Sequence, residues 1–143
     1  MLNIYVEIDA GLSLDDSLSP QFKAYAWLVG KDRPLDGLES LTDIQLLQRY
    51  GMATLYFSLA GHGWTDQENW LTTEDVCKWE NVEECNSAEM VTFLELYSNN
   101  LVGRIPVEIS HIRMLGTCFL ALEFLEECLL FVAQDLPPMR NLF

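Results

Sequence analysis

The stretch LELYSNNLVGRIPVEIS, residues 94–110, combines regular apolar spacing with an asparagine and a Gly-x-x-Pro corner. Leu94 and Leu96 alternate as in a half-buried strand, which places Glu95 and Tyr97 on the opposite, solvent-facing side. Beyond the strand, the apolar spacing fits neither a strand nor a helix throughout. The stretch therefore predicts a strand, a turn and an irregular return path, as in one coil of a solenoid.

The corner residues each suit a particular backbone requirement. We expect Asn99 to face inward after the strand and to hydrogen-bond backbone groups that the turn exposes. Gly103 permits a tight bend, and Pro106 holds an extended return path without needing a partner for its nitrogen. The apolar positions that frame the coil are Val91, Leu94, Leu96, Leu101, Ile105, Ile109, Ile112 and Leu115.

Residues 91–115 resemble the plant-type leucine-rich repeat, whose pattern is L-x-x-L-x-L-x-x-N-x-L-x-G-x-I-P-x-x-I over about 24 residues. The preceding segment resembles the N-terminal cap of the same family, in which a C-x-W-x-x-V-x-x-C-like segment covers the first coil. Cys77, Trp79, Val82 and Cys85 take those places here. The upstream apolar segment looks like the helical lead-in of receptor-like members, particularly those of algal type.

The resemblance implies a binding surface, because in this family the concave strand face recognises peptides or proteins. The matching outward positions are Glu95, Tyr97 and Ser98. Asn81 departs from the family pattern, which usually has glycine before the valine of the cap. The structural positions of the repeat are Leu94, Leu96, Asn99, Leu101, Gly103, Ile105 and Pro106.

The expected fold class is α/β, with a helical lead-in, a Cys/Trp N-terminal cap and one to two leucine-rich-repeat coils that form a short solenoid. Ser19 followed by Pro20 suits a helix start, and Thr42 with Gln45 forms a capping-box pattern. Three tryptophans between the second helix and the repeat indicate a compact, loop-rich unit. The predicted regions are an extended arm (1–18), the helical lead-in (19–63), the cap (64–90), the repeat (91–115) and a closing segment (116–143).

The closing segment has two interpretations. Shifting the sequence by 24 residues aligns its apolar positions with the first repeat, which favours a degenerate second coil. However, Glu123, Glu127 and Leu130 replace the asparagine, glycine and proline of the corner, and the segment consists mostly of good helix formers. We therefore favour a closing helix slightly over a second coil.

Composition excludes several partner classes. The 143 residues include 22 acidic and 8 basic side chains, and the net charge of -14 repels nucleic acid and anionic lipid. The most apolar stretch, residues 114–133, is long enough to span a bilayer but contains three glutamates, each costing roughly 2 to 3 kcal/mol near the bilayer centre. We expect neither a membrane-spanning segment in this chain nor a secretory signal at its N-terminus.

The four cysteines form two pairs by spacing. A disulfide is the better interpretation for Cys77 and Cys85, whereas Cys118 and Cys128 lie among apolar residues and suit buried thiols. A disulfide would place the chain in an extracellular or luminal compartment, but no export signal is visible, so the compartment stays open. The spacing does not favour a zinc site, and we expect no metal and no cofactor.

The sequence favours a non-enzymatic protein–protein interaction or scaffolding module. It contains no phosphate loop, kinase motif or nucleophile elbow, and His62, between two glycines, is best explained as a turn residue. The alternative is a small accessory subunit of a larger assembly, such as a membrane-bound one, that docks through the apolar C-terminal segment. One and a half coils are too few for a stable solenoid, so we also expect association through that apolar end.

Overall fold

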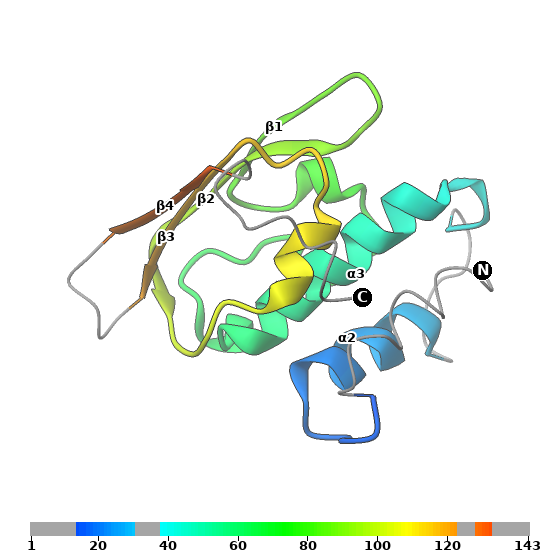
Figure 1. Ribbon diagram of the computed structural model, residues 1–143, viewed down its shortest axis with the longest axis horizontal. Helices are drawn as coiled ribbons and strands as arrows, with labels where there is room; N and C mark the ends of the chain where they lie inside the picture. The colour runs from blue at the N-terminus through cyan, green and yellow to red at the C-terminus, as the bar shows by residue number, and fades with distance from the viewer. Residues whose placement is uncertain (1–13, 31–37, 123–127, 133–143) are drawn as a thin grey trace.

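The structure, a computed structural model, describes residues 14–30, 38–122 and 128–132. Two α-helices lie side by side, and a four-stranded sheet lies beyond the longer one (Figure 1). The helices are α2 (Pro20–Val29) and α3 (Asp43–Ser58), and the strands are β1 (Val82–Cys85), β2 (Val91–Leu101), β3 (Thr117–Leu122) and β4 (Cys128–Val132). Four 3-10 turns connect them: η1 (Leu38–Ser40), η2 (Gly61–Gly63), η3 (Val76–Lys78) and η4 (Val107–His111).

Both helices begin at the caps that the sequence predicts. The Ser19 hydroxyl accepts a hydrogen bond from the Phe22 amide at 3.0 Å. At the start of α3, the Gln45 amide donates to the Thr42 hydroxyl at 3.2 Å, and the Thr42 amide donates to the Gln45 side chain at 2.9 Å. This reciprocal pair satisfies two amide groups that have no partner within the helix.

Helix α3 is buried on several sides, as its wide apolar stripe predicts. Every residue from Leu46 to Tyr56 is buried, including Gln48 and Arg49. The Gln48 side chain accepts from the Val91 amide at 2.7 Å and donates to the Glu89 carbonyl at 3.1 Å. These two bonds satisfy a buried side-chain amide and fix the beginning of β2 against α3.

The sheet has the order β1-β2-β3-β4, with mixed strand directions. β1 runs antiparallel to β2, β3 runs parallel to β2, and β4 runs antiparallel to β3. β2 and β3 pair Phe93 with Thr117 and Leu96 with Leu120, an offset of 24 residues. The crossover between these parallel strands runs through η4, which packs on α3.

The expected fold class, a short solenoid of leucine-rich-repeat coils, is wrong. A solenoid of this kind adds one parallel strand with each coil, but in the described residues only β2 and β3 are parallel. β1 and β4 both pair antiparallel with their neighbours, so neither outer strand extends the row of parallel strands that a solenoid would build. The described chain is a small unit of two helices and one mixed sheet.

The favoured closing helix is also wrong where the structure describes that segment. Residues 117–122 and 128–132 form strands that pair with each other, from Thr117 with Val132 to Ala121 with Cys128. The physical reason is that helix propensity is a weak preference, which pairing along a neighbouring strand overrides. Residues 123–127 and 133–143, on which the expected apolar docking end also depends, lie outside the described residues.

The core divides between two sets of side chains. One set lies between α2 and α3 and consists of Ala24, Leu28, Leu46, Leu47, Tyr50 and Ala53. The larger set joins α3, the tryptophan-rich loop between η2 and β1 (residues 64–81), β2 and η4. It includes Met52, Leu55, Leu59, Trp64, Trp70, Trp79, Leu94, Leu96, Leu101, Ile109, Ile112 and Leu115. The inward residues of β2 therefore belong to the same core as the tryptophans.

The tryptophan-rich loop is compact, as the sequence predicts. Trp64, Trp70 and Trp79 are all buried, and adjacent ring centroids lie 4.9 and 5.1 Å apart. Their indole nitrogens donate to the carbonyls of Leu59, Glu80 and Glu74, at 2.9, 2.8 and 3.2 Å respectively. Each ring thus contributes apolar area while its polar group stays paired.

Candidate functional site

The candidate site is the side of the β1–β2 pair that faces away from the core. Leu94 and Leu96 are fully buried, so the alternating residues Phe93, Glu95 and Tyr97 project from the opposite side. Glu84 of β1 pairs with Phe93 at an irregular point where the register shifts on both sides. Glu84 is exposed, whereas its neighbour Cys85 packs against the core, which puts Glu84 on the outward side. We call these four residues, Glu84, Phe93, Glu95 and Tyr97, the outer face.

The outer face contains two aromatic rings and two carboxylates, with unequal exposure. Tyr97 is 59% exposed, and Glu84 is exposed, whereas Phe93 and Glu95 are half-buried. Within the part of the chain that the structure describes, no hydrogen bond or ion pair engages the side chains of Glu84, Glu95 or Tyr97. Among the described residues, these groups can therefore bind an incoming ligand without first breaking a hydrogen bond or ion pair.

Ser98 marks the end of the outer face. Its φ of 54° lies in the left-handed region, and Asn100 has a φ of 60°, so the regular alternation stops after Tyr97. Ser98 is exposed, next to the outer face in sequence. The structure therefore brings Glu95 and Tyr97 to one side of one strand and puts Ser98 at the bend that follows.

Asn99 turns inward and is buried, as the sequence predicts. Its side chain accepts from the Asp66 amide at 2.7 Å and donates to the Asp66 carbonyl at 2.8 Å. It therefore bonds the backbone of the tryptophan-rich loop. Asn100 adds a second link, because its side chain donates to the Gly63 carbonyl at 2.8 Å.

The other residues assigned to the repeat hold the chain after β2 against α3. Leu101 is buried in the core, Ile105 is half-buried against it, and Pro106 is the N-cap residue of η4. Gly103 has a φ of 132°, and a Cβ at this position would lie 2.0 Å from the Ser58 carbonyl oxygen. The bend thus requires glycine both for its backbone angle and for its close approach to the end of α3.

The Cys77–Cys85 disulfide is present and connects η3 directly to β1, the strand that carries Glu84. The Asp75 side chain caps η3 by accepting from the Cys77 amide at 2.7 Å. Asn81, between η3 and β1, has a φ of 69°, a left-handed conformation that asparagine tolerates better than most residues. These contacts fix the edge strand of the outer face.

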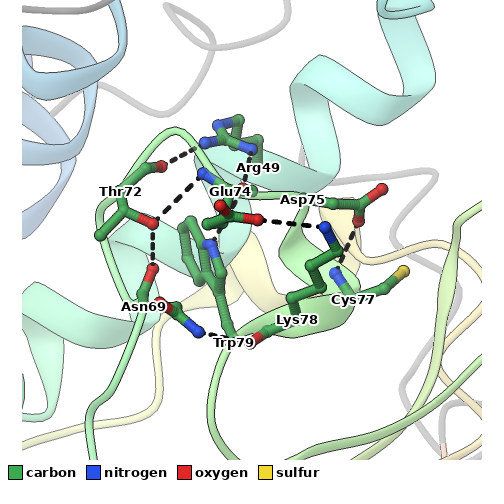
Figure 2. A network of polar contacts seen from close by, with 8 residues as sticks. All are labelled: Arg49, Asn69, Thr72, Glu74, Asp75, Cys77, Lys78 and Trp79. Atoms are coloured by element: carbon green, nitrogen blue, oxygen red, sulfur yellow. Dashed lines mark hydrogen bonds and ion pairs between the residues drawn. The ribbon is translucent and has the colours of Figure 1, made fainter.

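Arg49 is a buried residue that the sequence analysis missed. Its guanidinium lies 5.4 Å from the centroid of Trp27 and 5.3 Å from that of Trp79. It donates to the Thr72 carbonyl and, at 3.1 Å, to the Glu74 carbonyl (Figure 2). Burial lowers the pKa of Arg49, and the Asp75 carboxylate opposes that shift.

These contacts let one cation join three parts of the fold: α2, α3 and the loop before η3. Carbonyls of this loop accept hydrogen bonds from three side chains. The Trp27 nitrogen donates to the Leu71 carbonyl at 2.9 Å, and Arg49 and Trp79 both donate to the Glu74 carbonyl. Arg49 thus holds the loop that leads into η3 and β1. The signal in the sequence was an arginine within an otherwise apolar helical stretch, followed by several tryptophans.

The two histidines lie in unrelated surroundings. His62 is exposed on η2, whereas His111 is buried on η4 with its ring centroid 5.9 Å from that of Tyr50. Burial, together with nearby Arg113, lowers the pKa of His111 to about 4. No group of three metal-binding side chains occurs in residues 14–30, 38–122 and 128–132.

Comparison with known proteins adds no assignment: the chain matches no family model, no curated protein and no solved structure. Among the described residues, neither helix has the length and apolar character needed to cross a membrane. The site must therefore be interpreted from its own geometry.

Proposed function

We propose that the protein is a non-enzymatic interaction module that binds protein or peptide through its outer face. The observation that carries this proposal is Tyr97, an aromatic side chain that stays 59% exposed on a strand whose other side is fully buried. Tyrosine at such a position offers a large apolar ring and a hydroxyl at little cost in conformational entropy, and it is enriched where proteins bind each other.

The rigidity of the support also favours binding. β2 is bonded to β1 on one side and β3 on the other, and Gln48 of α3 and the Cys77–Cys85 disulfide hold the neighbouring backbone. A surface held in this way loses little conformational freedom when a ligand binds.

The alternative, an accessory subunit that docks through its apolar C-terminal segment, depends on residues 123–127 and 133–143, outside the described residues. The described part of the chain offers no observation that favours it. The four residues of the outer face present a small area, so we expect peptides bound there alone to have modest affinity.

The test is selection of peptides from a displayed random library on the wild-type protein, followed by affinity measurement on variants. Tyr97→Ala should weaken the selected peptides by about tenfold or more, the loss typical of an aromatic contact at an interface centre. Val107→Ala is the matched control, since Val107 is 54% exposed but lies on η4. Equal binding by wild type and Tyr97→Ala, or a failure to select any peptide, would contradict the proposal.

A further inference from the structure

The outer face lies in a part of the chain with a strong charge asymmetry. From Trp79 to Gly103 the sequence contains five glutamates and no lysine or arginine. The β3 and β4 ranges contain no basic residue either. A ligand on this side of the sheet therefore meets negative charge without a compensating cation on the strands.

The carboxylates of the outer face alternate with aromatic rings. Glu84 lies across from Phe93, and Glu95 lies between Phe93 and Tyr97 along β2. Same-side neighbours along a strand are two residues apart, so one side chain of a ligand can reach a carboxylate and a ring together. A lysine or arginine suits this arrangement, because it forms ion pairs with carboxylates and cation–π contacts with aromatic rings.

We infer that the ligand of the outer face is an extended peptide segment rich in lysine or arginine. This inference rests on the proposed function and specifies its partner. The fold itself uses the same chemistry at Arg49, whose guanidinium lies against Trp27 and Trp79. The outer face presents the acidic and aromatic half of such a contact, and the partner supplies the cation.

Charge complementarity favours a cationic peptide over a second copy of the chain or an apolar segment as the ligand of the outer face. A second copy of the chain carries the same net charge of -14 and would be repelled at low salt. A purely apolar segment would bury the carboxylates of Glu84 and Glu95 without a partner, which is unfavourable. A cationic segment neutralises both carboxylates and covers the exposed ring of Tyr97.

The test uses three fluorescent peptides of equal length with alternating Arg–Ser, Leu–Ser and Glu–Ser sequences, and it measures fluorescence anisotropy at low and at physiological salt. The Arg–Ser peptide should bind most tightly and weaken as salt increases. The double variant Glu84→Gln/Glu95→Gln should weaken it by roughly three- to tenfold, the range expected for two ion pairs at the protein surface.

The control variant is Asp15→Asn/Glu39→Gln, which makes the same change in net charge. Both residues are exposed; Asp15 precedes α2, and Glu39 lies in η1, before α3. Helix α2 packs on α3 and lies away from β2, β3 and β4 (Figure 1). The inference requires this control to bind like the wild type. Equal weakening by both double variants would overturn it, because the attraction would then come from the overall charge.

The outcomes separate this inference from the function on which it rests. If the Leu–Ser peptide binds best and loses affinity with Tyr97→Ala but not with Glu84→Gln/Glu95→Gln, the interaction module stands and the cationic partner is wrong. If no peptide shows sensitivity to Tyr97→Ala, the proposed function fails as well. Circular dichroism of each variant checks that the fold is retained.

Discussion

Replacing Arg49 tests how the fold supports the outer face. Arg49→Met keeps most of the side-chain volume but removes the guanidinium from between Trp27 and Trp79 and from the carbonyls of Thr72 and Glu74. The Glu74 carbonyl keeps a bond from the Trp79 indole, whereas the Thr72 carbonyl loses the guanidinium that it accepts from.

The expected loss of stability follows from these contacts. Two cation–π contacts at a buried site contribute about 1 kcal/mol each, and a carbonyl left without its partner costs about 1 to 2 kcal/mol. Removing a buried charge recovers part of its desolvation cost, which offsets some of this loss. We therefore expect Arg49→Met to lower the free energy of unfolding by about 2 to 4 kcal/mol.

Urea denaturation followed by tryptophan fluorescence measures this loss. With a slope of about 2 kcal/mol per molar urea, the midpoint should fall by roughly 1 to 2 M. The urea midpoint of Arg49→Lys should lie between those of the wild type and Arg49→Met, because lysine keeps the charge but not the planar donor pair. Lys78→Met is the matched control, since the Lys78–Glu74 ion pair at 3.2 Å is exposed and should contribute less than about 1 kcal/mol. Equal midpoints for Arg49→Met and Lys78→Met would refute this reasoning.

Three further predictions concern the bend after β2, the core histidine and the inward asparagine. Gly103→Ala should destabilise the protein by more than about 2 kcal/mol in the same urea assay, because the new Cβ would strike a backbone oxygen and the backbone φ at this residue is positive. The control Gly63→Ala should cost far less, because a Cβ there meets only a side-chain nitrogen at 3.8 Å. Folding lowers the pKa of His111 from 6.5 to about 4, so its contribution to stability is complete above pH 6.5 and is lost as the pH falls toward 4. This contribution amounts to roughly 3 kcal/mol, and thermal unfolding of His111→Leu across that pH range should show a flatter dependence than the wild type. Asn99→Ala removes both hydrogen bonds to the Asp66 backbone and should cost roughly 1 to 3 kcal/mol by urea denaturation, and an unchanged midpoint would show that water replaces them.

Features that depend on a few neighbouring residues could be predicted from the sequence. The Ser19 and Thr42 caps form because their hydroxyls reach amides only three residues away, and the structure confirms both. The Cys77–Cys85 disulfide closes a short loop, and it is also confirmed. The inward direction of Leu94 follows from strand alternation, which is again a local property.

Features that depend on distant segments could not be predicted in the same way. Apolar spacing predicts where a strand lies but not the direction in which the next strand returns, so the antiparallel pairing of β4 was missed. Asn99 was expected to bond the turn after β2, but its partner is Asp66, far earlier in the chain. Arg49 is buried only because α2 and the tryptophan-rich loop bring Trp27 and Trp79 to it.

The candidate site shows the same division. Alternation along β2 was enough to place Glu95 and Tyr97 together on one side. Phe93 follows from the same alternation, whereas Glu84 joined them only through the pairing between β1 and β2, which no local pattern specifies. The part of the outer face on β2 could therefore be predicted from the sequence, whereas its extension onto β1 could not.

Mapping a bound peptide on the protein by NMR tests the central claim most directly. In a titration of the isotope-labelled protein with the Arg–Ser peptide, the largest amide shift changes should fall on residues 82–85 and 91–97, and those of α2 should stay unchanged. Shift changes centred on α2 and α3, with β1 and β2 unaffected, would show that the outer face is not the binding surface.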